Sequence, residues 1–133
     1  MLLATLLSSA LLLPQAPPPD AAARRQAEAH VRDARRLMAS EAFAEAAEEY
    51  RKAIKLNRYF TVAYYGLGQA HMALKEYPGA AKAFEQAKSV FHEVAGDAAL
   101  RQLESDKVRD DRIRDLRDAI TELNSRQVAA NSP

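Results

Sequence analysis

The 133-residue chain contains no cysteine and no tryptophan, and only four glycines. The missing cysteines exclude disulfide bonds, thiolate metal ligands and a cysteine nucleophile. The scarcity of glycine argues against sandwiches and barrels, which need many tight turns. Positive charge is not in excess, because 19 Lys and Arg stand beside 18 Asp and Glu. The chain therefore lacks the basic surplus that drives binding to the phosphate backbone, and we expect an all-α protein with no nucleic-acid ligand.

Charge is absent from the N-terminal segment, where Asp20 is the first charged side chain. The apolar run from Leu2 to Leu13 has the length of a signal-peptide core and is too short for a membrane span, which needs about 20 residues. We expect residues 1–23 to form a signal-peptide-like segment and a proline-rich spacer, with no stable membrane span. A mis-assigned start or an uncleaved tail is the alternative. The protein is exported, to the periplasm or outside the cell, if this segment is a true signal peptide, and cytoplasmic otherwise.

From Asp20 onward the sequence is rich in strong helix formers and is interrupted by short turn signals. Asp20 is well placed to cap the first helix, and Pro78 suits a first helical turn because its missing N–H is not needed there. The expected helices cover residues 21–40, 43–56, 61–74, 78–91 and 98–126. Short connections make neighbouring helices antiparallel. The fold class is therefore all-α, a short α-solenoid of two helix-turn-helix pairs with a long C-terminal helix.

The chain repeats itself at a spacing of 34 residues, so that residues 24–94 contain two copies, 27–60 and 61–94. Both small and large side chains coincide in this register. The coincident positions include Met38 with Met72, Phe43 with Tyr77, Ala46 with Ala80, Tyr50 with Phe84 and Ala53 with Ala87. Small residues let one helix lie close to its partner, and large aromatic residues fill the remaining space. The register thus predicts two similar helix pairs.

This pattern resembles the tetratricopeptide repeat, whose signature is W-x₂-L-G-x₂-Y followed by A-x₃-F and a proline. In the second copy, Leu67 and Gly68 match the first part of the signature, and Ala80 and Phe84 match the second part. The first copy is looser. Asp33 takes the place of the leucine there, which suits a helix that begins the array and has no earlier repeat to pack against.

The resemblance implies a non-enzymatic protein–protein interaction module. In this family the first helix of each pair lines a concave groove that receives a peptide or a partner helix. On that geometry the predicted groove residues are Val31, Arg35, Met38, Val62, Tyr65, Gln69 and Met72. Methionine adapts its shape, tyrosine offers a broad face with a polar tip, and arginine can pair with a carboxylate. The carboxylate clamp of the co-chaperone members is not reproduced, so the partner's identity stays open. Alternatively, the N-terminal extension or the last helix covers part of this lining.

The last segment, residues 95–128, is expected to cap the second repeat and to extend into a short coiled coil, with a flexible tail at 129–133. A polar outer face suits the end of a repeat array. Four apolar residues follow one another at the spacing of a coiled-coil seam: Ile113, Leu116, Ile120 and Leu123. This seam either joins another helix or folds back on the repeats. The alternative function is therefore a structural homo-oligomer held by the last helix, with the repeats as a stiffening element.

Candidate catalytic and metal-binding residues are scarce. None of the three histidines lies in a ligand spacing, and the chain has no glycine-rich phosphate loop. The acidic cluster of Glu45, Glu48 and Glu49 is expected to be a solvated helical face, since a perturbed carboxylate needs burial. We therefore predict no enzymatic activity, no cofactor and no metal.

Overall fold

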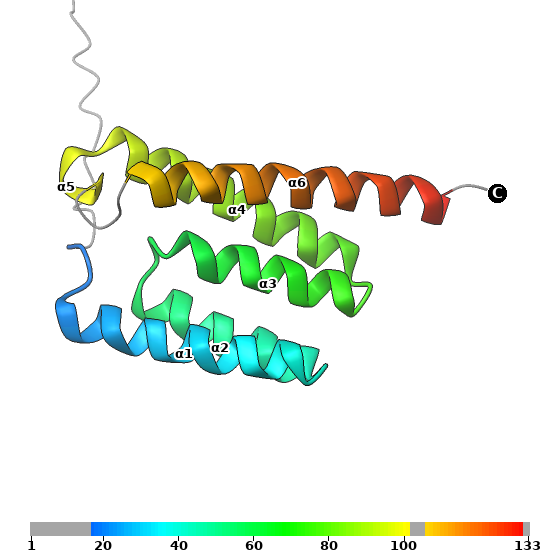
Figure 1. Cartoon of the computed structure of the whole chain (residues 1–133), viewed down its shortest axis with the longest axis horizontal. Coiled ribbons are helices and arrows are strands. Elements are labelled where there is room, and N and C mark those ends of the chain that lie inside the picture. The colour runs from blue at the N-terminus through cyan, green and yellow to red at the C-terminus, as the bar shows by residue number, and fades with distance from the viewer. Residues whose placement is uncertain (1–16, 102–105, 132–133) are drawn as a thin grey trace, which may run out of the picture.

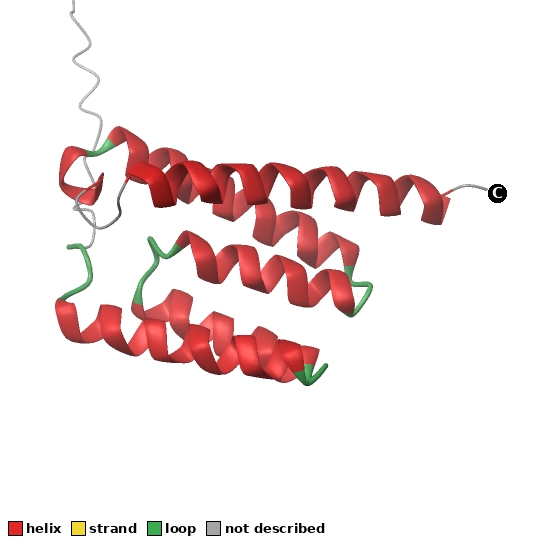
Figure 2. Ribbon diagram, viewed as in Figure 1, coloured by secondary structure: helices red, strands yellow, loops and turns green. Residues whose placement is uncertain are grey.

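The computed structural model describes residues 17–101 and 106–131, and every regular element in this part of the chain is a helix (Figure 1; Figure 2). The helices are α1 (Ala21–Ala39), α2 (Phe43–Leu56), α3 (Thr61–Ala73), α4 (Tyr77–Gly96), α5 (Ala98–Arg101) and α6 (Asp106–Asn131). The all-α prediction is confirmed. Most of the predicted signal-peptide-like segment, residues 1–16, and the end of the predicted tail, residues 132–133, lie outside the described residues.

Local sequence sets the helix boundaries. The carboxylate of Asp20 accepts a hydrogen bond of 2.8 Å from the backbone N–H of Ala23 and thereby caps α1. Pro78 lies in the first turn of α4, as expected. The turns that follow α1 and α3 place Glu41 and Lys75 at φ values of 61° and 59°. These two residues are one repeat apart, so the 34-residue register extends to the backbone of the turns.

The helices are arranged in two layers (Figure 1). Helices α1, α3 and α6 run in one direction in the front layer, and α2 and α4 run in the opposite direction behind them. Helix α3 packs against both α1 and α2, and α6 packs against both α3 and α4 in the same way. Helix α6 therefore occupies the place of the first helix of a third pair.

Close contacts between small and aromatic residues hold the pairs together. A Cβ atom added at Gly68 would lie 2.4 Å from Cε1 of Phe84, and one added at Gly66 would lie 2.2 Å from Cζ of Tyr50. Both aromatic side chains are buried. Glycine is required at these two positions because the aromatic rings take the space that a side chain would fill.

The C-terminal segment differs from the prediction of one helix over residues 98–126. The structure has two helices there, α5 and α6, on either side of residues 102–105, which are not described. The apolar side chain of Leu100 in α5 packs with Tyr59 and Val94, whereas Leu116 in α6 packs with Phe84. The two helices thus bury their apolar residues at different places on the repeats.

Helix α6 also continues to Asn131, beyond the expected end at Arg126 and into the segment predicted to be a flexible tail. Alanine has the highest helix propensity, and Ala129 and Ala130 extend the helix because no glycine or proline interrupts it before Pro133. None of the helices in the described ranges is long and apolar enough to cross a membrane.

Candidate peptide-binding groove

Two hollows lie along the face formed by α1, α3 and α6. One, of about 110 Å³, opens between the middle of α1, the beginning of α3 and α6. The other, of about 270 Å³, opens where α1 and α3 end. Together they define the surface that we call the groove. Its principal residues are Arg35 and Met38 of α1, Val62, Tyr65, Gln69 and Met72 of α3, and Arg112, Asp115, Ala119, Glu122 and Arg126 of α6.

The structure brings six of the seven predicted groove residues together on this surface and places the seventh in the core. Val31 is only 3% exposed and packs with Ala27 and Ala34, which lie one turn away on either side of it. This stripe of α1 faces the other helices, so the assignment of Val31 to the groove is wrong. Met72 is also largely buried, at 8% exposed, but it still lines the larger hollow and forms part of its floor.

Tyr65 provides a fixed aromatic surface in the groove. Its ring centroid lies 5.9 Å from that of Phe84, with an angle of 48° between the two planes. The Tyr65 hydroxyl oxygen accepts a hydrogen bond of 3.0 Å from Nε2 of Gln69. Phe84 is fully buried, so it supports the Tyr65 ring from beneath. A ligand that packs on this ring does not need to order it first, which lowers the entropic cost of binding.

Charged side chains line both walls of the groove. Burial raises the pKa of Tyr65, and the nearby carboxylates of Asp115, Asp118 and Glu122 raise it further, although the hydrogen bond from Gln69 acts in the opposite direction. Helix α6 therefore presents an acidic wall to Tyr65, which Arg112 and Arg126 of the same helix interrupt. The opposite wall, on α1, carries the exposed guanidinium of Arg35 in the same hollow as Asp115.

Sequence analysis missed this acidic wall. The signal was present, because Asp111, Asp115, Asp118 and Glu122 follow one another at spacings of four, three and four along one helical stripe. Part of the wall is already neutralised, since Glu122 forms an ion pair of 2.6 Å with Arg126. The sequence allows the last helix to cover part of the groove lining, but it does not show which stripe of that helix faces Tyr65.

The seam predicted for a coiled coil is used within this chain. Leu116 and Leu123 are each 4% exposed and pack in a cluster with Phe84, and Ile120 packs at the edge of that cluster. Ile113 lines a separate hollow between α4 and α6. The seam therefore folds back on the repeats, and the coiled-coil prediction is wrong for its two leucines, which have no surface left for another helix.

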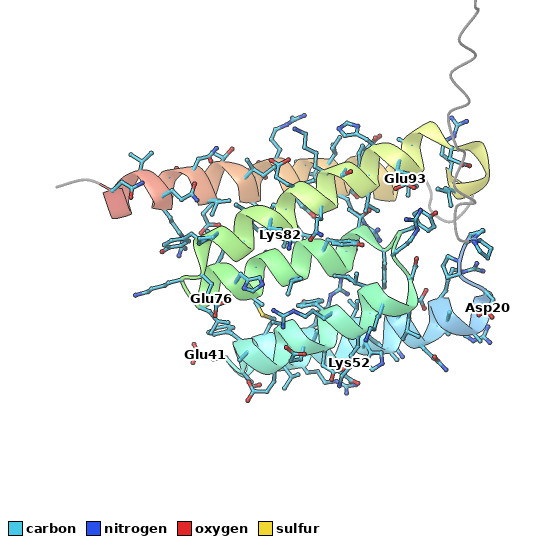
Figure 3. All side chains as sticks on the ribbon, turned by 180° about the vertical axis from the view of Figure 1, so that it is seen from behind. Asp20, Glu41, Lys52, Glu76, Lys82 and Glu93 are labelled. Atoms are coloured by element: carbon cyan, nitrogen blue, oxygen red, sulfur yellow. The ribbon has the colours of Figure 1, made fainter. Side chains whose placement is uncertain are left out.

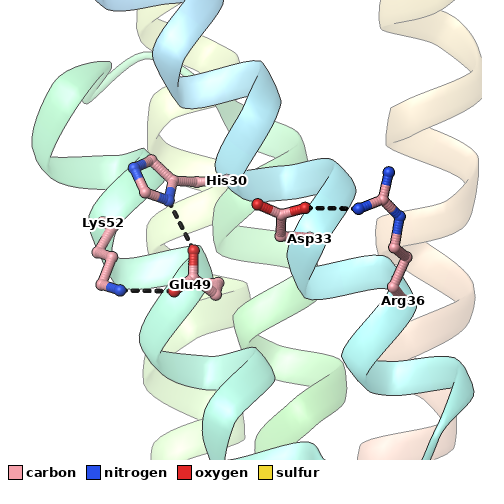
Figure 4. A network of polar contacts seen from close by, with 5 residues as sticks. All are labelled: His30, Asp33, Arg36, Glu49 and Lys52. Atoms are coloured by element: carbon pink, nitrogen blue, oxygen red, sulfur yellow. Dashed lines mark hydrogen bonds and ion pairs between the residues drawn. The ribbon is translucent and has the colours of Figure 1, made fainter.

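The acidic cluster on α2 is not uniformly solvated, as Figure 4 shows for Glu49. Its carboxylate lies 2.6 Å from Nδ1 of His30 on α1 and 2.5 Å from Nζ of Lys52, and its side chain is 17% exposed. The hydrogen bond from Lys52, followed by the one with His30, holds the pKa of Glu49 below its usual value. The contact with His30 joins α1 to α2, so we assign Glu49 a structural role.

Asp33 lies on the solvent side of α1, where it pairs with Arg36 at 3.0 Å (Figure 4). Both side chains are more than half exposed, which agrees with the prediction that α1 begins the array. Within the described ranges, no group of three or more His, Cys, Asp or Glu side chains is placed to hold a metal ion.

Stacked helix pairs with a 34-residue register, in which glycine and alanine face aromatic rings, define an α-solenoid of helix hairpins. The family model described as Tetratricopeptide repeat matches residues 37–106, just over half of the chain. The chain belongs to the tetratricopeptide repeat family, and the resemblance found in its sequence is confirmed. Proteins of this family generally act in protein–protein interaction as non-enzymatic scaffolds. Among curated proteins and solved structures, none matches the chain.

Proposed function

We propose that this protein is a non-enzymatic adaptor that binds a peptide or a partner helix in the groove between α1, α3 and α6. One observation carries the proposal: open hollows flank the fixed ring of Tyr65, and α6 borders them without filling them. The methionines Met38 and Met72 in the larger hollow suit apolar side chains of varied shape.

The charges of the groove indicate which way a ligand is oriented. Arg35 on α1 offers a bidentate partner for a carboxylate, and Asp115 on α6 offers a partner for a lysine or arginine. A ligand that crosses Tyr65 would therefore place an acidic side chain toward α1 and a basic side chain toward α6. Such complementarity contributes more to specificity and to the association rate than to affinity.

The first experiment is an affinity capture from an extract of the source organism, with the full chain as bait. The test bait carries Tyr65→Ala and Arg35→Ala. The matched control carries Arg32→Ala, which removes an exposed arginine of the same helix that does not line the groove. Circular dichroism of all three baits checks that their helicity is equal.

A protein retained by the wild type and by Arg32→Ala, and lost with the double variant, supports the groove. Equal retention of a protein by all three baits shows that this protein does not bind in the groove. If the baits recover nothing but the chain itself, the structural homo-oligomer becomes the better function.

We also propose that the protein is exported. The support is the uncharged apolar run from Leu2 to Leu13, followed by prolines before α1 begins. Mass spectrometry of the C-terminally tagged protein, purified from separated cell fractions, should give a form in the exported fraction that lacks this run. A full-length form confined to the cytoplasm contradicts export.

A further inference from the structure

A further hollow, of about 280 Å³, lies between α4 and α6 outside the groove. Its main lining residues are Lys88 and Phe91 of α4 and Ile113, Leu116, Arg117 and Ile120 of α6. We call it the α4–α6 hollow. The side chain of Leu116 also lines the groove, so this residue separates the two surfaces. A molecule bound in one hollow does not occupy the other.

An equivalent hollow, of about 370 Å³, lies one repeat earlier, between α2 and α3. Its lining includes Ile54 of α2, and Lys88 occupies the same position of α4 one repeat later. The earlier hollow has a third wall, which is α4 itself, with Gly79 and Ala83 facing it and Lys82 beside them. Figure 3 shows Lys82 on α4, seen from behind the molecule.

The α4–α6 hollow has no such third wall among residues 17–101 and 106–131. It is the place that the second helix of a third pair would take, because α6 packs on α4 as α3 packs on α2. The floor of the hollow is apolar, with Phe91, Ile113 and Ile120. A helix is therefore the element that fits it.

The rim of the hollow is basic. Lys88 and Arg117 are both exposed, and neither forms an ion pair with any residue in the described part of the chain. Arg117 has Ile113 and Thr121 as its neighbours at four residues and Arg114 and Ile120 at three, so the positions that face it on its own helix carry no carboxylate. An occupant with Asp or Glu beside its apolar ridge would complement this rim.

We propose that the α4–α6 hollow is a second binding site, which takes an amphipathic helix of a partner protein with an apolar ridge of small residues flanked by acidic side chains. Gly79 and Ala83 of α4 show that small residues suit the equivalent position. The proposal does not depend on the groove. With both sites occupied, the protein joins two partners.

The test uses two fluorescein-labelled peptides and the full chain. The first peptide has the sequence of residues 77–91, which supplies the third wall of the earlier hollow, with Lys82→Glu and Gln86→Glu. The second peptide has the unaltered sequence. Fluorescence anisotropy gives the affinity of each peptide for the wild type. We expect the wild type to bind the acidic peptide about tenfold more tightly than the unaltered peptide, because two exposed charge pairs are gained.

Protein variants then locate the site. The charge reversal Lys88→Glu with Arg117→Glu should weaken binding of the acidic peptide about tenfold. The matched control, Arg25→Glu with Lys75→Glu, changes the net charge equally at exposed positions outside the hollow and should leave the affinity within about twofold, since distant surface charges are screened. Tyr65→Ala should also leave it unchanged, which separates this proposal from the groove.

Failure of the wild type to bind either peptide overturns the proposal, as does equal binding of the acidic peptide by the wild type and the charge-reversal variant. Loss of binding in Tyr65→Ala would show that the peptide binds in the groove, and it would also overturn the proposal. A wild type that self-associates, and becomes monomeric on charge reversal, would make a second copy the occupant in place of a partner protein.

Discussion

The substitution Gly68→Ala tests the close contact on which the second helix pair depends. The new Cβ atom would lie 2.4 Å from Cε1 and 2.6 Å from Cδ1 of Phe84, about 1 Å closer than carbon atoms normally approach each other. Phe84 is only 1% exposed, and the Tyr65 ring lies against it. The Phe84 ring therefore has little space into which it can move.

The expected loss of stability is the difference between two terms. Overpacking a core costs about 1–3 kcal/mol, and alanine is favoured over glycine within a helix by about 1 kcal/mol. Because three atoms of the Phe84 ring lie within 2.8 Å of the new Cβ atom, the upper part of the first range applies. We expect Gly68→Ala to lower the free energy of unfolding by about 1–2 kcal/mol.

Urea denaturation followed by circular dichroism measures this difference, and the midpoint should fall while the slope stays the same. The control is Gly96→Ala near the end of α4, where nothing lies within 4 Å of the new Cβ atom. We expect no loss there, because alanine favours the helix. If Gly68→Ala were as stable as the wild type, the reasoning about close packing would be refuted. Equal losses in both variants would show that the loss does not come from the contact with Phe84, because helix propensity alone predicts a gain at both positions.

Three further predictions follow from burial. Burial raises the pKa of Tyr50 above its usual value of about 10, so its contribution to stability is present below pH ~10 and is lost as the pH rises through the folded-state pKa. Tyr50→Phe should therefore lose less stability than the wild type between pH 8 and pH 11 in urea denaturation, and equal losses would contradict this. Leu116→Ala should lower the free energy of unfolding by about 2–5 kcal/mol, because the side chain is 4% exposed, and a change within measurement error would show that α6 is not firmly packed. Sedimentation should give a monomer of 14.7 kDa for the full chain, and an oligomer that Ile120→Asp dissociates would restore the coiled-coil reading.

The fold was largely predictable because its local signals agree with one another. Asp20 and Pro78 mark where helices begin, and the matching of Tyr50 with Phe84 marks the repeat. Each of these signals depends on neighbouring residues or on the fixed length of one helix pair. Such information is contained in the chain itself.

The last helix was harder to predict, because one apolar stripe serves several partners. Leu116 and Leu123 have the spacing of a coiled-coil seam, but the same spacing suits packing against two helices of the same chain. Only the three-dimensional arrangement shows that Phe84 receives them. The acidic wall containing Asp115 was also missed. Helix α6 does not continue the 34-residue register, so the repeat does not indicate which of its side chains face the groove.

The assignment of Val31 failed because alanine-rich helices give a weak orientation signal. Val31 and Met38 are seven residues apart and lie on nearly the same stripe of α1. The stripe turns gradually around the helix, so Val31 packs with Ala27 and Ala34, whereas Met38 reaches the larger hollow. A rotation of about 20° around the helix axis separates the core position of Val31 from the groove position of Met38.

The most direct test of the central claim is the affinity of the captured partner for the wild type and for Tyr65→Ala, measured by isothermal titration calorimetry. The account predicts that Tyr65→Ala binds at least about tenfold more weakly, a difference of about 1.4 kcal/mol, while its helicity and the affinity of the Arg32→Ala control remain those of the wild type. Equal affinity of Tyr65→Ala and the wild type would contradict the account, because the partner would then bind without the groove.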